Sequence, residues 1–222
     1  MTTFDVRPSL ASAFVRMWRA WRILVPVILV NLGIQAITVW APFTYDTGLW
    51  AFASALVSGL ALWIAFAFVC AAALAVSHGP VRWSSVLRSV RNNVLRYVVW
   101  SLVWGAAVAV GLALFVLPGI IVCLLTPFLA LAILDGQPNP LKSNLRAIRT
   151  RFWRWLITCA LALLVLTIAW FASGFVVFFL RPPLATVPVW LVGGSLIAWF
   201  MTAFAMIYRS SAALGGSTST QA

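Results

Sequence analysis

The chain has 222 residues, of which 64% are hydrophobic and 8% are charged, whereas soluble domains average about 45–50% apolar and about 25% charged residues. Such a small number of charges cannot cover the surface of a soluble domain. The composition therefore excludes a soluble protein and indicates that lipid surrounds most of the chain. Fifteen Lys and Arg residues against three Asp and Glu give a net charge of +12. Because the basic residues flank apolar runs, this charge favours a membrane surface and not nucleic acid as the partner.

Six apolar runs are candidates for membrane-spanning helices, which need about 20 such residues. The fourth run is short, because its residues would reach only about 24 Å as a helix against about 30 Å of hydrocarbon. We therefore expect an all-α integral membrane protein. The expected spans are 23–40, 49–76, 97–116, 119–134, 155–180 and 184–208.

The basic residues give these spans an orientation. All but Arg181 lie in the N-terminal segment, in the connections after the second and fourth runs, or after the sixth run. Because Lys and Arg mark the cytoplasmic side, both termini should be cytoplasmic, and residues 117–119 should form a tight outer turn. The N-terminal segment has no signal-peptide cleavage pattern. The Arg-, Ala-, Val- and Leu-rich composition favours a GC-rich bacterium, and therefore the bacterial inner membrane.

A short basic pattern recurs ahead of each pair of runs. The pattern Pro-x7-Arg-x2-Arg begins at Pro8, Pro80 and Pro138. It predicts a single domain over 1–209, built from three copies of an interfacial amphipathic helix followed by a helical hairpin. The small polar residues of 210–222 predict a disordered cytoplasmic tail. The expected repeat units are about 8–76, 80–134 and 138–208.

Each basic segment also has an amphipathic spacing, which is clearest in the third. Its apolar residues are spaced by 4, 3 and 4 positions, which is typical of one helical face, with basic residues opposite. Such a helix beside a span is expected to lie in the headgroup plane. The predicted apolar face of the third segment consists of Leu141, Leu145, Ile148 and Phe152, and its basic face of Lys142, Arg146 and Arg149.

The arginine pair of each repeat is a candidate site for anionic lipid. Each Arg near an anionic leaflet contributes on the order of 1 kcal/mol. The alternative is that these residues only set the orientation during insertion. The expected lipid-binding residues are Arg16, Arg19, Arg88, Arg91, Arg146 and Arg149.

The fourth run holds the second candidate site. It follows Pro118 and Gly119 and contains Pro127 near its middle. Short hydrophobic segments interrupted by Gly or Pro indicate substrate sites in transporters. The alternative interpretation is a tilted helix with a proline kink.

Residues able to perform catalysis are sparse. The carboxylates are Asp5, Asp46 and Asp135, and no two of them are close in sequence. The predicted spans contain no Asp, Glu, Lys, Arg or His, and the cysteines lack metal-ligand spacing. Proton-coupled carriers usually need intramembrane carboxylates or His. We therefore expect no enzyme activity, no metal and no cofactor.

Residues 118–156 resemble a broad group of bacterial polytopic membrane proteins. The similar features are the Pro118-Gly119 pair, an Asp135-Gly136 turn and a basic helix ending in 151–154, Arg-Phe-Trp-Arg. The group includes the YciC-like proteins and the membrane domain of some glycerophosphodiester phosphodiesterases. This sequence differs from the group at two positions, with Asn144 where Ser is usual and Thr150 where Gly is usual. The resemblance implies a six-span membrane protein without an assigned reaction.

Two functions remain open from the sequence. The first is a non-catalytic membrane protein, a subunit or accessory factor of a membrane complex, which binds anionic phospholipids and a membrane-protein partner or a second copy of itself. The alternative is a transporter or channel component, similar to a permease or a lipid flippase. Co-purification in mild detergent separates them, because a stoichiometric partner supports the first and substrate-dependent flux in liposomes supports the second.

Overall fold

The computed structural model describes residues 10–40, 48–77, 79, 81–114, 116–180 and 182–216. Within these ranges the chain is helical and contains no strand. The expectation of an all-helical protein is confirmed. The helices are α1 (Leu10–Arg19), α2 (Trp21–Trp40), α3 (Gly48–Val76), α4 (Trp83–Leu114), α5 (Val116–Leu125), α6 (Leu129–Leu134), α7 (Pro140–Thr150), α8 (Phe152–Phe179) and α9 (Pro182–Gly216).

Six stretches of the described chain are long and apolar enough to cross a membrane, which confirms the predicted number of spans. Five of them are single helices, and the fourth, Leu117–Leu134, comprises most of α5 together with α6. The third begins at Trp83 because it is continuous with the basic segment before it.

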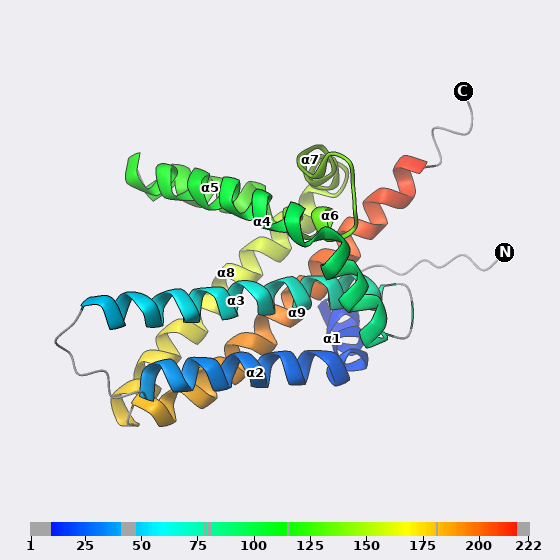
Figure 1. Ribbon diagram of the computed structural model, residues 1–222. Helices are drawn as coiled ribbons and strands as arrows, with labels where there is room; N and C mark the ends of the chain where they lie inside the picture. The colour runs from blue at the N-terminus through cyan, green and yellow to red at the C-terminus, as the bar shows by residue number, and fades with distance from the viewer. Residues whose placement is uncertain are drawn as a thin grey trace.

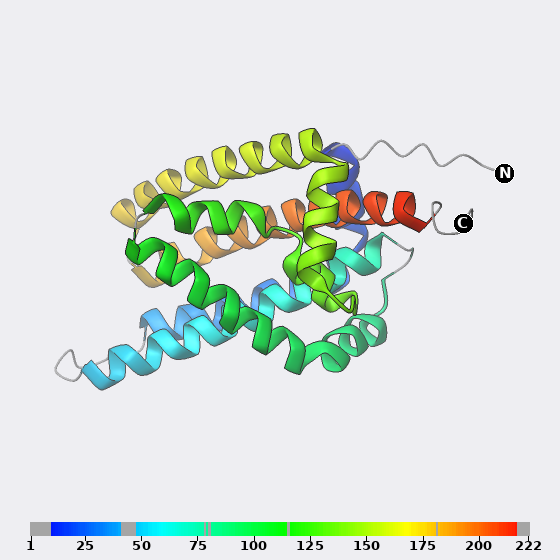
Figure 2. The ribbon, with the colours of Figure 1, turned by 90° about the horizontal axis from the view of Figure 1, so that it is seen from above.

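The spans form three hairpins that extend in the same general direction. Figures 1 and 2 show the tips of α2–α3, α4–α5 and α8–α9 at one end of the molecule. The helices α1 and α7, the basic start of α4 and both ends of the described chain lie at the other end. The basic segments are therefore grouped at one end of the bundle, which we call the basic end.

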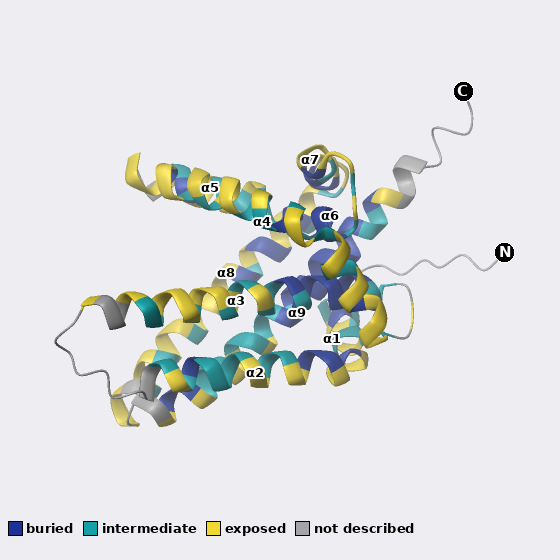
Figure 3. Ribbon diagram, viewed as in Figure 1, coloured by how far each residue is buried: buried dark blue, intermediate teal, exposed yellow. Residues whose placement is uncertain are grey.

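The buried core lies toward the basic end. It contains the second half of α3, all of α6 except Ala130, and residues 198–208 of α9. Figure 3 shows these buried segments meeting where α3, α6 and α9 approach one another. The spans α4 and α8 are the least buried of the six. The bundle is therefore packed tightly at its basic end, and most of the surface of α4 and α8 faces outward.

The three basic segments differ in structure. The first and third form separate helices, α1 and α7, whereas the second is the beginning of α4. Residues 83–114 contain no proline, so no residue interrupts the hydrogen bonds of that helix. The basic part of α4 instead runs at an angle to the rest of the helix (Figure 2). Pro8 and Pro80, which define the first two repeats, lie outside the described residues.

Residues 117–119, where we expected the turn between the third and fourth spans, are helical. We predicted a turn at 117–119, but Pro118 and Gly119 lie in the first turn of α5. Pro is tolerated there because the first N–H groups of a helix have no intrahelical partner. Gly119 packs against Gly111 of α4, where an added Cβ would lie 2.8 Å from the Gly119 nitrogen. The glycine is therefore needed for close helix packing and not for the turn.

This contact predicts that Gly111→Ala destabilises the α4–α5 hairpin. The new methyl group would meet backbone atoms, which cannot rotate away, so the two helices must separate at a cost of about 1–3 kcal/mol. Gly105→Ala in the same helix is the control, because nothing lies within 4 Å of its Cβ position. That substitution should stabilise by about 0.5–1 kcal/mol. The free energy of unfolding of each variant is measured in denaturing detergent by tryptophan fluorescence. Equal changes in the two variants would contradict the close contact at Gly111.

The helix α9 extends further than expected. It continues to Gly216, so residues 210–216, which we predicted to be part of a disordered tail, are helical. Ser211 is buried, and its hydroxyl donates to the Tyr208 carbonyl oxygen. Ser and Ala residues can extend a helix whose preceding part is already packed against the protein. The composition alone therefore underestimated the length of α9. Residues 217–222 lie outside the described part of the chain.

Candidate functional site

The fourth span is interrupted in its second half. The helix α5 ends at Leu125 and α6 begins at Leu129, with Pro127 between them. Proline has no N–H and its ring displaces the preceding turn of a helix. Such a break leaves carbonyl and N–H groups without helical partners, and they need other partners inside a membrane protein.

The side chain of Asn144, in α7, supplies these partners. Its Nδ2 donates to the Leu125 carbonyl oxygen at 2.6 Å, and its Oδ1 accepts from the Phe128 N–H at 3.0 Å. Asn144 is completely buried. One amide thus joins the end of α5 to the start of α6, and it holds α7 against the break.

Thr126 completes the hydrogen bonding of the break. Its hydroxyl donates to the Val122 carbonyl oxygen at 2.6 Å and accepts from the indole N–H of Trp104 at 2.8 Å. The predicted site residues Pro118 and Gly119 lie at the other end of α5 from Pro127. The structure therefore does not bring these three together, and Asn144 and Thr126 surround the proline instead.

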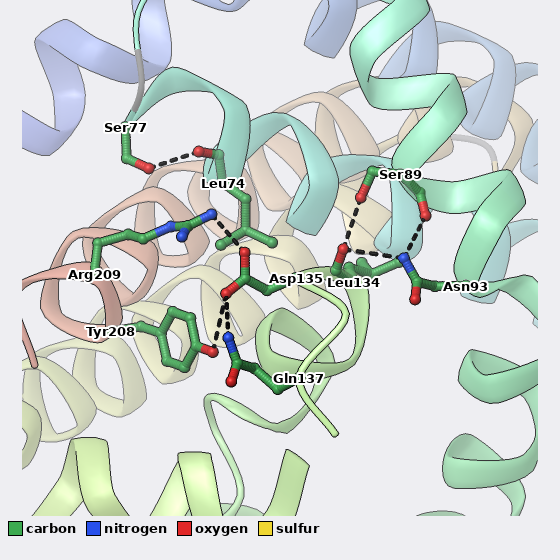
Figure 4. A network of polar contacts seen from close by, with 9 residues as sticks. All are labelled: Leu74, Ser77, Ser89, Asn93, Leu134, Asp135, Gln137, Tyr208 and Arg209. Carbon is green, nitrogen blue, oxygen red and sulfur yellow. Dashed lines mark hydrogen bonds and ion pairs between the residues drawn. The ribbon is translucent and has the colours of Figure 1, made fainter. Parts of the chain in front are cut away.

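A second polar cluster, which we call the Asp135 junction, lies where α6 ends. Asp135 pairs with Arg209 of α9 at 2.6 Å and also accepts from the Tyr208 hydroxyl at 3.3 Å and from Gln137 at 3.0 Å. Figure 4 shows these side chains converging on the carboxylate. Among the residues that the structure describes, Asp135 is the one acidic residue that forms a salt bridge.

The same junction is fixed from the side of α4. Ser89 and Asn93 both donate to the Leu134 carbonyl oxygen (Figure 4). Arg96 donates to the carbonyl oxygens of Gln137 and Pro138. The helices α4, α6 and α9 are therefore connected through the loop that leads into α7.

The α7 helix packs against the rest of the protein through a face centred on other residues than its predicted apolar face, whose packing against the protein we did not predict. The expected apolar face was Leu141, Leu145, Ile148 and Phe152, but of these only Ile148 is buried. The inward face centres on Asn144 and Ala147, which are both completely buried. We did not predict the burial of the Asn144 amide, because a single Asn in a basic segment is usually expected to face solvent. The other three apolar residues therefore face outward, beside the basic ones.

The predicted lipid-binding arginines are distributed over three helices at the basic end. Arg16 and Arg19 lie on α1, Arg88 and Arg91 on α4, and Arg146 and Arg149 on α7. All are exposed except Arg16, which is half-buried. Within the described residues none of the six has a carboxylate partner, since the ion pair found there joins Asp135 to Arg209. Among the described residues they form a basic surface that is dispersed over three helices.

The structure also reveals polar residues inside the spans that sequence reasoning missed. Gln35 of α2 is buried, donates to the Ser58 carbonyl oxygen at 3.1 Å and accepts from the Ser58 hydroxyl at 2.5 Å. Its amide also lies 3.4 Å from the Asn31 oxygen. The sequence signal was an Asn and a Gln four positions apart within an apolar run, which places both on one helical face. This cluster connects α2 to α3.

No protein family, curated protein or solved structure matches the chain.

Proposed function

We propose that the chain is a non-catalytic, multi-pass protein of a bacterial inner membrane, whose basic end lies in the cytoplasm and contacts anionic phospholipids. The observation that supports it best is the grouping of α1, α7 and the start of α4 at one end, with arginines that lack a described carboxylate partner. Unpaired arginines beside spans attract anionic headgroups. Both termini are cytoplasmic in this proposal.

The proposal includes the repeat organisation and the family resemblance. Each repeat would consist of a basic segment and the hairpin that follows it, with the second basic segment fused to its span. The likeness of 118–156 to YciC-like proteins and to the membrane domain of glycerophosphodiester phosphodiesterases fits a six-span protein of this kind. Determining whether related chains keep a buried Asn or Ser at position 144 and a proline at 127 tests the resemblance.

Within the membrane we propose that the protein acts as a subunit or accessory factor. The helices α4 and α8 expose large apolar side chains along most of their length, including Leu102, Val103, Trp170 and Phe171. In a bilayer these surfaces contact lipid tails, a membrane-protein partner or a second copy of the chain. Purification in mild detergent with quantification of the bound chains distinguishes a stoichiometric partner or homo-oligomer from a monomer surrounded by lipid.

The lipid contact predicts a loss of bound lipid when the surface is neutralised. Replacing Arg88, Arg91, Arg146 and Arg149 with Gln should reduce co-purified anionic phospholipid several-fold, because each charge contributes on the order of 1 kcal/mol. Lipid extraction and mass spectrometry measure the retained lipid. The matched control replaces the same four residues with Lys, which preserves the charge and should retain the lipid. A reporter fused after residue 222 checks that the topology is unchanged; undiminished lipid in the Gln variant would contradict the proposal.

A transporter or channel component is the second candidate, and the interrupted fourth span favours it. Broken spans line substrate sites in many transporters, and the Gln35 cluster adds polar groups within the membrane. The freed backbone groups at Leu125 and Phe128 are already bonded to Asn144, which weakens this candidate. Substrate-dependent flux in liposomes that contain only this chain would favour it over the accessory role.

A further inference from the structure

The outward face of α7 combines charge and apolar surface in one hollow. A hollow of about 530 Å³ is lined by Asn139, Leu141, Lys142, Leu145, Arg146, Arg149 and Thr150. Ligand sites usually measure about 300–1,000 Å³. The hollow is therefore large enough for a headgroup, and the residues around it come from one short helix and its N-cap.

Three cations of this hollow lie on one side of the helix. Lys142, Arg146 and Arg149 are exposed and fall within an arc of roughly 60° at 3.6 residues per turn. Like charges at this spacing repel one another. The carboxylate described in this region, Asp135, is bound to Arg209. An anion between the three side chains would relieve the repulsion.

An apolar row lies directly beside the cations. Leu141 and Leu145 are 42% and 43% exposed, and on a helix they lie next to the basic side chains. The span α8 begins at Phe152, immediately after α7 ends, so the helix that carries this row leads directly into a membrane span. A soluble anion would leave these leucines in water, whereas a phospholipid covers them with its glycerol and acyl chains.

We propose that α7 carries a discrete site for one anionic phospholipid, whose phosphate lies between Lys142, Arg146 and Arg149 and whose acyl chains lie along Leu141 and Leu145. The inference rests on the proposed contact of the basic end with anionic lipid, and deepens it. It assigns the strongest lipid binding to α7, and adds to the site Lys142 and the two leucines.

Native mass spectrometry of the full chain in neutral detergent tests the site. The protein is titrated with phosphatidylglycerol and with phosphatidylcholine of the same acyl chains. We expect one phosphatidylglycerol to bind at least about tenfold more tightly than the next. Replacing Lys142, Arg146 and Arg149 with Gln should weaken this first binding roughly 100-fold, at about fivefold per charge. Tryptophan fluorescence checks that each variant is folded.

Two further variants separate the possible outcomes. Replacing Arg16, Arg19 and Arg88 with Gln removes three charges elsewhere and should change the first binding less than about threefold. Equal losses in the two triple variants would overturn the discrete site and leave the dispersed surface standing. No loss in either would overturn both proposals. Leu141→Ser with Leu145→Ser should weaken binding about tenfold; unchanged binding, or displacement of the lipid by millimolar glycerol 3-phosphate, would overturn the lipid as the occupant.

Discussion

Asn144→Ala should cause the largest loss of stability of any single substitution considered for this protein, about 2–5 kcal/mol. The alanine removes both hydrogen bonds that join α5 to α6, to the Leu125 carbonyl oxygen and from the Phe128 N–H. The contact to the Phe128 N–H is buried and that to the Leu125 carbonyl is partly buried, and a buried backbone group left without a partner costs about 1–3 kcal/mol. The measurement is the free energy of unfolding in mixed detergent micelles, followed by tryptophan fluorescence.

Asn92→Ala is the matched control for this substitution. Asn92 is also an asparagine in a helix at the basic end, but it is exposed. Its replacement should change the free energy of unfolding by less than about 0.5 kcal/mol, as for most surface positions. A similar small effect for Asn144→Ala would show that the break in the fourth span is stable without the amide.

Asp135→Ala is expected to cost about 2–3 kcal/mol. The carboxylate is 12% exposed and its partner Arg209 is 28% exposed. Breaking a fully buried pair costs about 3–5 kcal/mol, and partial exposure of Arg209 lowers that figure. The substitution also leaves the Tyr208 hydroxyl and the Gln137 amide without their acceptor. Unfolding in mixed micelles measures this cost as well.

A double-mutant cycle isolates the ion pair from the other contacts. Arg209→Gln should cost less than Asp135→Ala, because the carboxylate keeps Tyr208 and Gln137. The double variant should be more stable than the sum of the single effects predicts, by about 1 kcal/mol. Arg91→Gln removes an exposed charge of the same sign and should be close to neutral. Additive effects of Asp135 and Arg209 would show that their contact contributes nothing.

The sequence was sufficient to predict the membrane class and the number of spans, because length and hydropathy directly reflect the thickness of the bilayer. It was less informative about where helices begin and end. The basic segment before the third span looked like the other two, yet it is continuous with α4, because repeated spacing does not encode whether a helix bends or stops. The turn expected at Pro118 and Gly119 was wrong because glycine serves close packing as readily as turns.

The candidate sites were less predictable because they depend on contacts between distant segments. Pro127 was a visible signal for an irregular fourth span. Its partner Asn144 is 16 residues away from Phe128 in the chain, and nothing in the local pattern connects the two. The same holds for Asp135 and Arg209, which are 74 positions apart. The exposure of the arginines could be predicted from sequence because it depends on their position beside the spans and not on a tertiary contact.

The interrupted fourth span has a consequence for the order of membrane insertion. As a helix of 10 residues, α5 is only about 15 Å long, half the thickness of the hydrocarbon layer. It cannot enter the bilayer alone, and its packing on α4 through Gly111 and Gly119 favours entry of the two as a pair. The amide that closes the break is translated 19 residues after Leu125. The fourth span can therefore reach its final form only after α7 has been synthesised and has packed against the break.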